Sequence, residues 1–326
     1  MRQIFIGGTG RSGTTIMSKI LGLHSEIYRY PFETRFMIDP HGLIDLVPAL
    51  SDQWSPWKAD RAIRDFEEMM WEVYPPAIRG TFRRIGGHIL TKLGTSLPRY
   101  ALWISYRDIM PRKVFTKELD EFTGKIVDRE FKGFWIGSGL HLSPKVYVAR
   151  SFKREEIARI SGDFVNGISS YPVKKAGKKM WLDHTPFNIL HASFLHEMFP
   201  EMKLIHIYRD PRDVISSYKT KSWGGNSAHD NAVWIRNILE KWEDEKKSLP
   251  DGTYYEVRME AAIKSPEKEL RKICDFLGVG FEKKMMNIDL SKGHVGRWKK
   301  DLKPDEIKVA NEVLGETLER YGYSRT

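Results

Sequence analysis

The stretch from Gln3 to Leu23, QIFIGGTGRSGTTIMSKILGL, constrains the fold more than any other part of the sequence. It begins with a short apolar run, which predicts a strand buried on both faces. Glycines and hydroxyl residues follow, and the apolar residues after them recur at helical spacing. A strand, a glycine-rich turn and a helix in this order direct backbone N–H groups and the positive end of a helix dipole at one point. The stretch therefore predicts an anion site, and phosphate is the usual occupant.

The turn can be aligned with the P-loop pattern G-x-x-x-x-G-K-[ST]. Gly8 and Gly13 occupy the glycine positions and Thr15 the Ser/Thr position, but Thr14 stands where the lysine is expected. In nucleoside triphosphatases that lysine reaches the β- and γ-phosphates, so this loop is expected to bind phosphate without the usual cation of a kinase. Arg11 supplies a charge earlier in the loop. The alternative is a tight turn that needs its glycines only for backbone conformation.

The chain of 326 residues is long enough for one large α/β domain with an insertion, or for two domains. The first predicted strand leaves no room for a signal peptide, and no apolar segment approaches the length of a membrane span, so a cytoplasmic protein is expected. The single cysteine, Cys274, excludes an intramolecular disulfide and a cysteine-rich metal site. Its apolar neighbours recur at helical spacing and predict a core position.

The net charge of +10 favours an anionic ligand. Zinc-finger, RRM-like and basic-zipper signatures are absent from the sequence, and the basic residues are scattered, so a nucleic acid partner is not expected. The excess charge instead predicts an anionic cofactor, an anionic acceptor, or both.

The middle of the chain, approximately residues 38–176, lacks clean strand alternation and predicts a largely helical insertion on the substrate side. Amphipathic helices are expected around Lys58–Val73 and Thr116–Phe131. Half of the ten tryptophans lie here, namely Trp54, Trp57, Trp71, Trp103 and Trp135. They would either pack in the core or form a wall of aromatic faces around an acceptor molecule.

Strands and helices alternate again after the insertion. The predicted elements are strands at Lys179–Asp183, Lys203–Tyr208 and Tyr254–Arg258, and helices that follow Pro186 through Phe199, at Pro266–Leu277 and at Pro304–Tyr321. Such alternation predicts a parallel sheet with sites at the carboxyl ends of its strands. The expected fold is a single α/β domain over residues 1–326, with a P-loop-type parallel β-sheet flanked by helices and the helical insertion within it.

A second anion site is predicted in the stretch IYRDPRDVISSY. Arg209 would lie at the carboxyl end of a strand, beside the P-loop if the two strands are neighbours. Asp210 is expected to cap the next helix, with Pro211 as its first residue and Asp213 as the acidic partner three positions after the cap. Arg209 and Ser217 could then hold a second phosphate. The alternative is an ordinary passage from a strand into a helix, where Arg-Asp-Pro is common.

A third basic segment, SKGHVGRWKK at residues 291–300, precedes the last predicted helix. Lys292 and Gly293 place an ammonium group beside an unobstructed backbone N–H. A loop of this composition is more often simply solvated.

The three motifs together resemble those of the sulfotransferases that use 3′-phosphoadenosine 5′-phosphosulfate (PAPS). In that family the 5′-phosphosulfate loop looks like Arg11–Thr15, the 3′-phosphate motif looks like Arg209–Ser217, and the C-terminal loop looks like Lys292–Lys299. The motifs occur in the family's order and span the chain except for the insertion. The resemblance implies that PAPS is bound by Gly10, Arg11, Ser12, Gly13, Thr14, Thr15, Arg209, Ser217, Lys292 and Gly293.

The resemblance also implies the activity, which is transfer of a sulfuryl group from PAPS to a hydroxyl acceptor by in-line displacement, with 3′-phosphoadenosine 5′-phosphate as product. Arg11 would stabilise the moving group. Glu33 stands where tyrosylprotein and bacterial relatives carry the glutamate that takes the proton of the acceptor. The alternative for Glu33 is a surface carboxylate paired with Arg35.

The sequence departs from the family in two places. His184 stands before Thr185-Pro186, where relatives often carry a lysine; it could donate to the sulfuryl oxygen, and it rivals Glu33 as the base. Met259 stands where many members carry a tyrosine, which puts a tyrosine contact to adenine in doubt.

The expected chemistry needs no metal, because the moving sulfuryl group bears less negative charge than a terminal phosphoryl group. The tryptophans and the positive charge favour a carbohydrate or another extended, possibly anionic acceptor. Two other functions compete with this hypothesis: a P-loop kinase-like phosphotransferase and a non-catalytic polyanion-binding protein.

Overall fold

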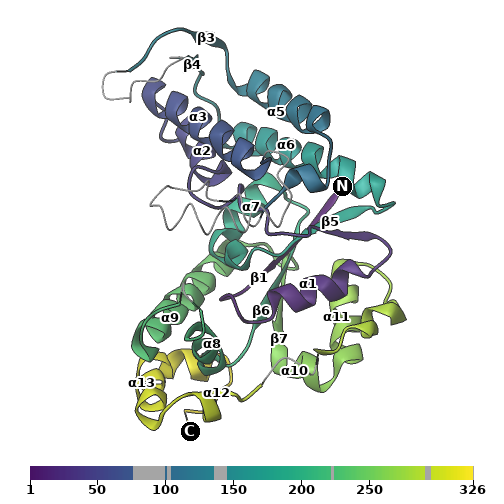
Figure 1. Ribbon diagram of the computed structural model, residues 1–326, viewed down its shortest axis with the longest axis vertical. Coiled ribbons are helices and arrows are strands. Elements are labelled where there is room, and N and C mark those ends of the chain that lie inside the picture. The colour runs from purple at the N-terminus through teal and green to yellow at the C-terminus, as the bar shows by residue number, and fades with distance from the viewer. Residues whose placement is uncertain (76–99, 101–103, 136–144, 222–223, 291–294, 326) are drawn as a thin grey trace. The chain divides into compact units, whose positions relative to one another are not determined.

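The computed structural model describes residues 1–75, 100, 104–135, 145–221, 224–290 and 295–325, which divide into two compact units (Figure 1). The first unit comprises Met1, Tyr30–Lys179 and Glu197–Pro200, and the second comprises Arg2–Arg29, Met180–His196 and Glu201–Thr326. That both units form a single domain, with residues 38–176 as an insertion, stays a prediction.

A five-stranded parallel sheet forms the centre of the second unit (Figure 1). Its strand order is β2–β5–β1–β6–β7. The strands are β1 Arg2–Gly7, β2 Ile27–Arg29, β5 Met180–Asp183, β6 Lys203–Tyr208 and β7 Tyr254–Arg258. The predicted α/β fold with a parallel sheet is therefore confirmed. Because β1 and β6 are parallel neighbours, the loops that follow Gly7 and Tyr208 leave the same edge of the sheet.

Helices cover both faces of this sheet. In chain order, the helices of the second unit are α1 Thr14–Gly22, η2 Pro186–His191 (a 3₁₀ helix), α7 Ala192–Met198 (whose last two residues belong to the first unit), α8 Pro211–Tyr218, α9 Ala228–Glu245, η3 Lys246–Ser248, α10 Met259–Lys264, α11 Pro266–Leu277, η4 Lys283–Asn287, α12 Trp298–Asp301 and α13 Pro304–Arg320. Figure 1 shows α1, α10 and α11 on one side of the strands, and α8, α9 and α13 on the other. This arrangement follows from strands that are apolar on both faces.

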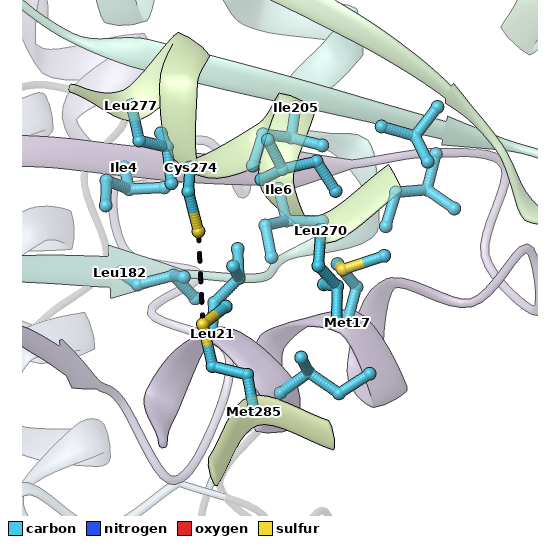
Figure 2. Close-up of a cluster of buried hydrophobic side chains, with 14 of the residues drawn as sticks. Ile4, Ile6, Met17, Leu21, Leu182, Ile205, Leu270, Cys274, Leu277 and Met285 are labelled. Carbon is cyan, nitrogen blue, oxygen red and sulfur yellow. Dashed lines mark hydrogen bonds between the residues drawn. The ribbon is translucent and has the colours of Figure 1, made fainter. Parts of the chain in front are cut away.

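The core between the sheet, α1 and α11 contains the only cysteine of the sequence (Figure 2). Ile4 and Ile6 of β1 pack there with Met17 of α1. Cys274 is 1% exposed, and its Sγ lies 3.9 Å from Sδ of Met285. Burial raises the pKa of the thiol to about 11. The predicted core position of Cys274 is therefore confirmed.

The first unit consists mainly of helices. Its elements are α2 Leu43–Leu50, α3 Pro56–Val73, η1 Tyr106–Asp108, α5 Arg112–Ile126, β3 Arg129–Phe131, β4 Val146–Val148 and α6 Arg154–Lys175. Aromatic rings join three of the helices: the ring centroids of Phe66 and Phe122 are 5.5 Å apart, and Phe122 stacks on Phe164 at 4.5 Å. Each such pair adds about 0.5–1.5 kcal/mol beyond the burial of its area.

The helix predicted at Thr116–Phe131 is wrong at its C-terminal end. Helix α5 ends at Ile126, and Arg129–Phe131 forms β3, which pairs antiparallel with β4. The N–H of Asp128 donates to the carbonyl of Val148 at 2.8 Å, so pairing with a distant strand overrides the local helical pattern. The predicted helix after Pro186 is likewise divided into the 3₁₀ helix η2 and the short α7.

The tryptophans of the first unit differ in exposure. Trp54, Trp57 and Trp71 are 39%, 53% and 39% exposed, so core packing is wrong for these three. Trp135 is half-buried and donates its ring N–H to Asp60 at 3.1 Å, and Trp103 lies outside the described residues. A role for these rings around an acceptor stays a prediction.

Candidate functional site

The loop between β1 and α1 is held in an unusual backbone conformation. Gly10 and Gly13 have φ angles of 74° and 118°, which glycine adopts without a Cβ clash, and Arg11 between them has φ of 57°. A left-handed conformation is unfavourable for arginine, and such strain is concentrated at functional positions. The N–H of Gly8 donates to the carbonyl of Pro186 at 2.8 Å, which fixes the loop to the segment after β5.

The loop ends at the N-terminus of α1, which suits an anion. Gly13 provides no side-chain cap, and the first turn has no acidic residue, so the free N–H groups and the positive end of the dipole are not neutralised by the helix itself. The hydroxyl of Ser12 is fully buried and has no hydrogen-bond partner within the described part of the chain. A buried hydroxyl costs stability unless it is bonded, so an anion that accepts its proton fits this position.

Gly8 leaves no room for a side chain. A Cβ there would lie 2.3 Å from the Ser12 hydroxyl oxygen and 2.4 Å from the carbonyl oxygen of Ile207. We expect Gly8→Ala to lower the free energy of unfolding by about 1–3 kcal/mol, as overpacking does. Gly124→Ala is the control, because a Cβ there meets nothing within 4 Å on helix α5, and it should raise stability by up to about 1 kcal/mol. Chemical denaturation would measure both, and equal effects would contradict the close packing of the loop.

The loop contacts Arg209, which precedes α8, as predicted if β1 and β6 are neighbours, and it also contacts the C-terminal end of α8. Nε of Arg11 donates to the hydroxyl of Ser217 at 2.9 Å, and Nη1 of Arg209 donates to the carbonyl of Arg11 at 3.3 Å. The hydroxyl of Tyr218 donates to the carbonyl of Thr9. Two arginines and two hydroxyl-bearing side chains that lie far apart in the sequence thus meet at one edge of the sheet. No signal in the sequence points to Tyr218 beyond its place next to Ser217.

Helix α8 begins as predicted, but one of its capping contacts is different. Asp210 is the N-cap and accepts the N–H of Arg212 at 2.9 Å, and Pro211 is the first helical residue. The prediction of Asp213 as the acidic partner of that cap is wrong. Its carboxylate instead accepts the N–H groups of Gly296 and Trp298 at 2.8 and 3.0 Å. A buried carboxylate takes the donors that surround it, and here these come from a distant segment.

Three other residues singled out in the sequence are Lys292, Gly293 and Met259. Lys292 and Gly293 lie outside the described residues. Met259 begins α10, is 2% exposed and packs against the loop: a Cβ built on Gly13 would lie 2.8 Å from its Sδ. Met259 is therefore a packing neighbour of the loop between β1 and α1.

His184 follows β5 and is almost completely buried. Its Nε2 lies 3.4 Å from Nη2 of Arg29, and because a guanidinium only donates, the neutral ring accepts there and carries its proton on Nδ1. Nδ1 is buried without a partner among the described residues. Burial lowers the pKa of His184 to about 4. The nearby Asp183 carboxylate raises the pKa, but its effect is smaller than that of burial. His184 is therefore neutral near pH 7 and offers one hydrogen-bond donor.

The buried His184 predicts a loss of stability in mild acid. Its pKa is about 4 in the folded protein and about 6.5 when unfolded, so between these values the unfolded chain binds more protons. The contribution of His184 to the free energy of unfolding should therefore fall by about 2 kcal/mol from pH 7 to pH 5. Urea denaturation of the wild type and His184→Asn at both pH values measures it. Equal pH dependence in the two proteins would contradict the depressed pKa.

Glu33, the predicted base, lies in the first unit and forms the ion pair that the sequence offered as the alternative. Nε and Nη2 of Arg35 lie 2.9 and 2.6 Å from one oxygen of Glu33, and Nη1 lies 3.3 Å from Asp39. Arg35 has a φ of 30°, a further strained position. The ion pair does not exclude a base, since a carboxylate held by arginine has lone pairs left, and the catalytic role stays a prediction.

Comparison with known proteins finds sulfotransferases that are similar to this chain in fold and, over part of its length, in sequence. The model of the "Sulfotransferase family" matches residues 140–283, which include His184 and the Arg209–Ser217 motif. The omega-hydroxy-beta-dihydromenaquinone-9 sulfotransferases Stf3 of Mycobacterium bovis (strain ATCC BAA-935 / AF2122/97) and Mycobacterium tuberculosis (strain CDC 1551 / Oshkosh) are each 30% identical over 156 residues. The match covers 43% of this chain and 40% of each of these relatives, so it spans less than half of their length.

A solved structure extends the likeness over the whole fold. The sulfotransferase domain of the olefin synthase of Synechococcus PCC 7002 matches with a TM-score of 0.53 and 17% sequence identity, and the match covers 99% of this chain and 95% of that one. The resemblance predicted from the sequence is therefore confirmed. The chain has the fold of a sulfotransferase domain, and its residues 140–283 match the model of the sulfotransferase family.

Proposed function

We propose that this chain transfers a sulfuryl group from PAPS to a hydroxyl acceptor. The observation that carries the proposal is the meeting of the two motifs that the sequence predicts to bind anions: Arg11 contacts Ser217, and Arg209 contacts the carbonyl of Arg11. PAPS bears a phosphosulfate and a separate phosphate on one nucleoside, and it therefore requires two such sites close together. Thr14 in place of the P-loop lysine argues against a kinase, because nothing in that position would reach a γ-phosphate.

The residues at the sheet edge fall into two groups. Gly10, Ser12, Gly13, Thr14 and Thr15 would hold the 5′-phosphosulfate through the α1 N-terminus, with Arg11 against the charge that develops during transfer. Arg209 and Ser217 would hold the 3′-phosphate, with Lys292 and Gly293 as further contacts. His184 could donate its Nδ1 proton to a sulfuryl oxygen.

Sulfuryl transfer requires positioning and neutralisation of charge more than covalent chemistry by the protein, as phosphoryl transfer does. Arginines and backbone N–H groups supply that neutralisation, so we propose a reaction without a metal. An acceptor alcohol has a high pKa and needs a base as its oxygen attacks the sulfur atom. Glu33 would accept this proton, and Arg35 would hold the carboxylate in position.

The acceptor is proposed to be a hydroxyl on an extended molecule. The mycobacterial relatives are named for an ω-hydroxylated dihydromenaquinone, which favours a hydroxylated lipid. The exposed Trp57 lines a shallow hollow of about 310 Å³ in the first unit. Most of the other lining residues are charged or polar, so the hollow suits the face of a sugar better than an apolar ring. None of the described helices is long and apolar enough to cross a membrane.

A nucleotide panel tests the cofactor. In thermal-shift measurements, 3′-phosphoadenosine 5′-phosphate should raise the melting temperature far more than ATP with Mg²⁺, and transfer from PAPS should continue in EDTA. Stabilisation by ATP·Mg²⁺ and strict dependence on Mg²⁺ would favour a kinase. Equal binding of any polyanion, with a steep dependence on salt, would favour a non-catalytic polyanion-binding protein.

A mass-spectrometric screen tests the acceptor. The protein is incubated with PAPS and separate pools of hydroxylated quinones, carbohydrates and tyrosine peptides, and products are sought by the mass gain of one sulfuryl group. Sulfation confined to the quinone pool would support a lipid acceptor. Sulfation confined to carbohydrates would support the alternative drawn from the tryptophans and the charge.

A further inference from the structure

Asp213 of α8 makes contacts that the roles proposed above do not use. Its side chain is completely buried. Its Oδ2 accepts the N–H of Gly296 at 2.8 Å and lies 3.0 Å from Nη2 of Arg209, while its Oδ1 accepts the N–H of Trp298 at 3.0 Å. One carboxylate therefore holds both the guanidinium at the end of β6 and the backbone of the turn that leads into α12.

These contacts are not needed to form α8. Asp210 already caps the helix, and the Asp213 side chain bonds to no group of the helix's first turn. A carboxylate is stable in a buried position only when its charge is compensated and its oxygens are bonded. Arg209 and the two N–H groups provide that compensation. Asp213 thus bonds to two residues, Gly296 and Trp298, that lie 83 and 85 positions after it in the sequence.

The turn at residues 296–298 has a second contact with α8. The ring of Trp298 is 6% exposed and lies 3.9 Å from Cζ of Arg212, a cation–π contact. Gly296 has a φ of 74°, a left-handed backbone conformation that glycine adopts more readily than other residues. The 296–298 turn is therefore held against α8 by contacts with both Arg212 and Asp213, and Asp213 supplies the negative charge among them.

Arg209 extends this connection to the phosphate loop. Its side chain is 8% exposed, and its guanidinium contacts the Asp213 carboxylate on one atom and the carbonyl of Arg11 on another. A continuous series of contacts thus runs from the 296–298 turn through Asp213 and Arg209 to the loop after β1. A guanidinium held on two sides loses less conformational entropy when it binds an anion than a free one does.

We propose that Asp213 is a positioning residue of the nucleotide site, which orients Arg209 and ties it to the 296–298 turn. Recognition of a 3′-phosphate and placement of the 296–298 turn are then a single event. The inference rests on the proposed function, because the 3′-phosphate belongs to the nucleotide proposed there. Asp213 itself touches no substrate in this scheme.

Asp213→Asn tests the inference, because it keeps the shape of the side chain and removes its charge. We expect it to weaken binding of 3′-phosphoadenosine 5′-phosphate by about tenfold or more, and binding of adenosine 5′-phosphate by less than about threefold. Isothermal titration calorimetry measures both. The amides of Gly296 and Trp298 should also exchange with deuterium faster in the variant.

Glu245→Gln is a matched control. Glu245 is 7% exposed, accepts the N–H of Ser193 at 2.9 Å and pairs with Lys241 at 2.7 Å, away from the nucleotide-site residues. It should lower stability without changing the ratio of the two nucleotide affinities. If Asp213→Asn leaves that ratio unchanged, or if both variants alter it equally, Asp213 has only a structural role and the inference is overturned.

A measurement on the wild-type protein covers the case in which Asp213→Asn does not fold. The bisphosphate nucleotide should slow exchange at the Gly296 and Trp298 amides more than adenosine 5′-phosphate does at equal saturation. Equal protection would overturn the coupling. If the wild type binds neither nucleotide, the proposed cofactor is wrong and this inference falls with it, whereas preference for the bisphosphate without added protection refutes the inference alone.

Discussion

Glu33→Gln should lower the turnover rate of sulfuryl transfer by roughly 10²–10⁴, the usual share of general-base catalysis. The substitution keeps the shape and removes the basicity of the side chain. It also weakens the pair with Arg35, whose two nitrogens lie 2.9 and 2.6 Å from the carboxylate. The affinity for the nucleotide should change by only a few-fold, since Glu33 belongs to no phosphate-binding motif. Steady-state kinetics and calorimetry measure the two quantities.

Asp39→Asn is the control for the ion pair, because Arg35 also contacts Asp39 at 3.3 Å. It should retain most of the turnover rate if basicity, and not the conformation of this segment, explains the loss in Glu33→Gln. His184 is the rival base. A near wild-type rate in Glu33→Gln, together with a collapse in His184→Asn that leaves nucleotide binding intact, would show that the base is assigned to the wrong residue.

Arg209→Ala should weaken binding of 3′-phosphoadenosine 5′-phosphate by about 1.5–3 kcal/mol, or roughly 10- to 150-fold. Ser217→Ala should act in the same direction, because it removes the hydroxyl that accepts from Arg11 and that we propose to bond the 3′-phosphate. The physical reason is the loss of charge-assisted hydrogen bonds.

Two controls isolate the 3′-phosphate. Ser216→Ala removes a neighbouring buried hydroxyl that is assigned no contact with either phosphate, so it should leave binding nearly unchanged. Adenosine 5′-phosphate should bind the wild type and both site variants with similar affinity. Equal losses for the two nucleotides would refute the assignment of Arg209 and Ser217 to the 3′-phosphate.

Structural features that depend on residues close together in the sequence could be predicted from the sequence. The strand, turn and helix around the phosphate loop follow from an apolar run, glycines and helical spacing, and the start of α8 follows from Asp210 and Pro211. The contact between Arg11 and Ser217 joins positions 206 apart. From the sequence, closeness of these two motifs could be predicted only if β1 and β6 are neighbours. The structure confirms that they are.

Two of the wrong predictions share one physical cause, which is a partner distant in the sequence. Asp213 has the spacing of a capping residue, yet its carboxylate bonds to the N–H of Gly296, 83 positions away. The end of the helix predicted to reach Phe131 pairs with β4 instead. For Glu33 the sequence left two roles open, a surface ion pair with Arg35 and a catalytic base. The structure shows the ion pair, which is compatible with the role of a base.

The buried thiol of Cys274 has a practical consequence for measuring motion in this protein. A thiol is modified as the thiolate, and here the pKa is raised to about 11 and the side chain is 1% exposed, so alkylating reagents should not modify the native chain. Its modification rate would report how often the core of the second unit opens. A cysteine introduced at an exposed position such as Lys117 of α5 would be the only readily reactive thiol, so a single dye or spin label could be attached to the first unit without replacing Cys274.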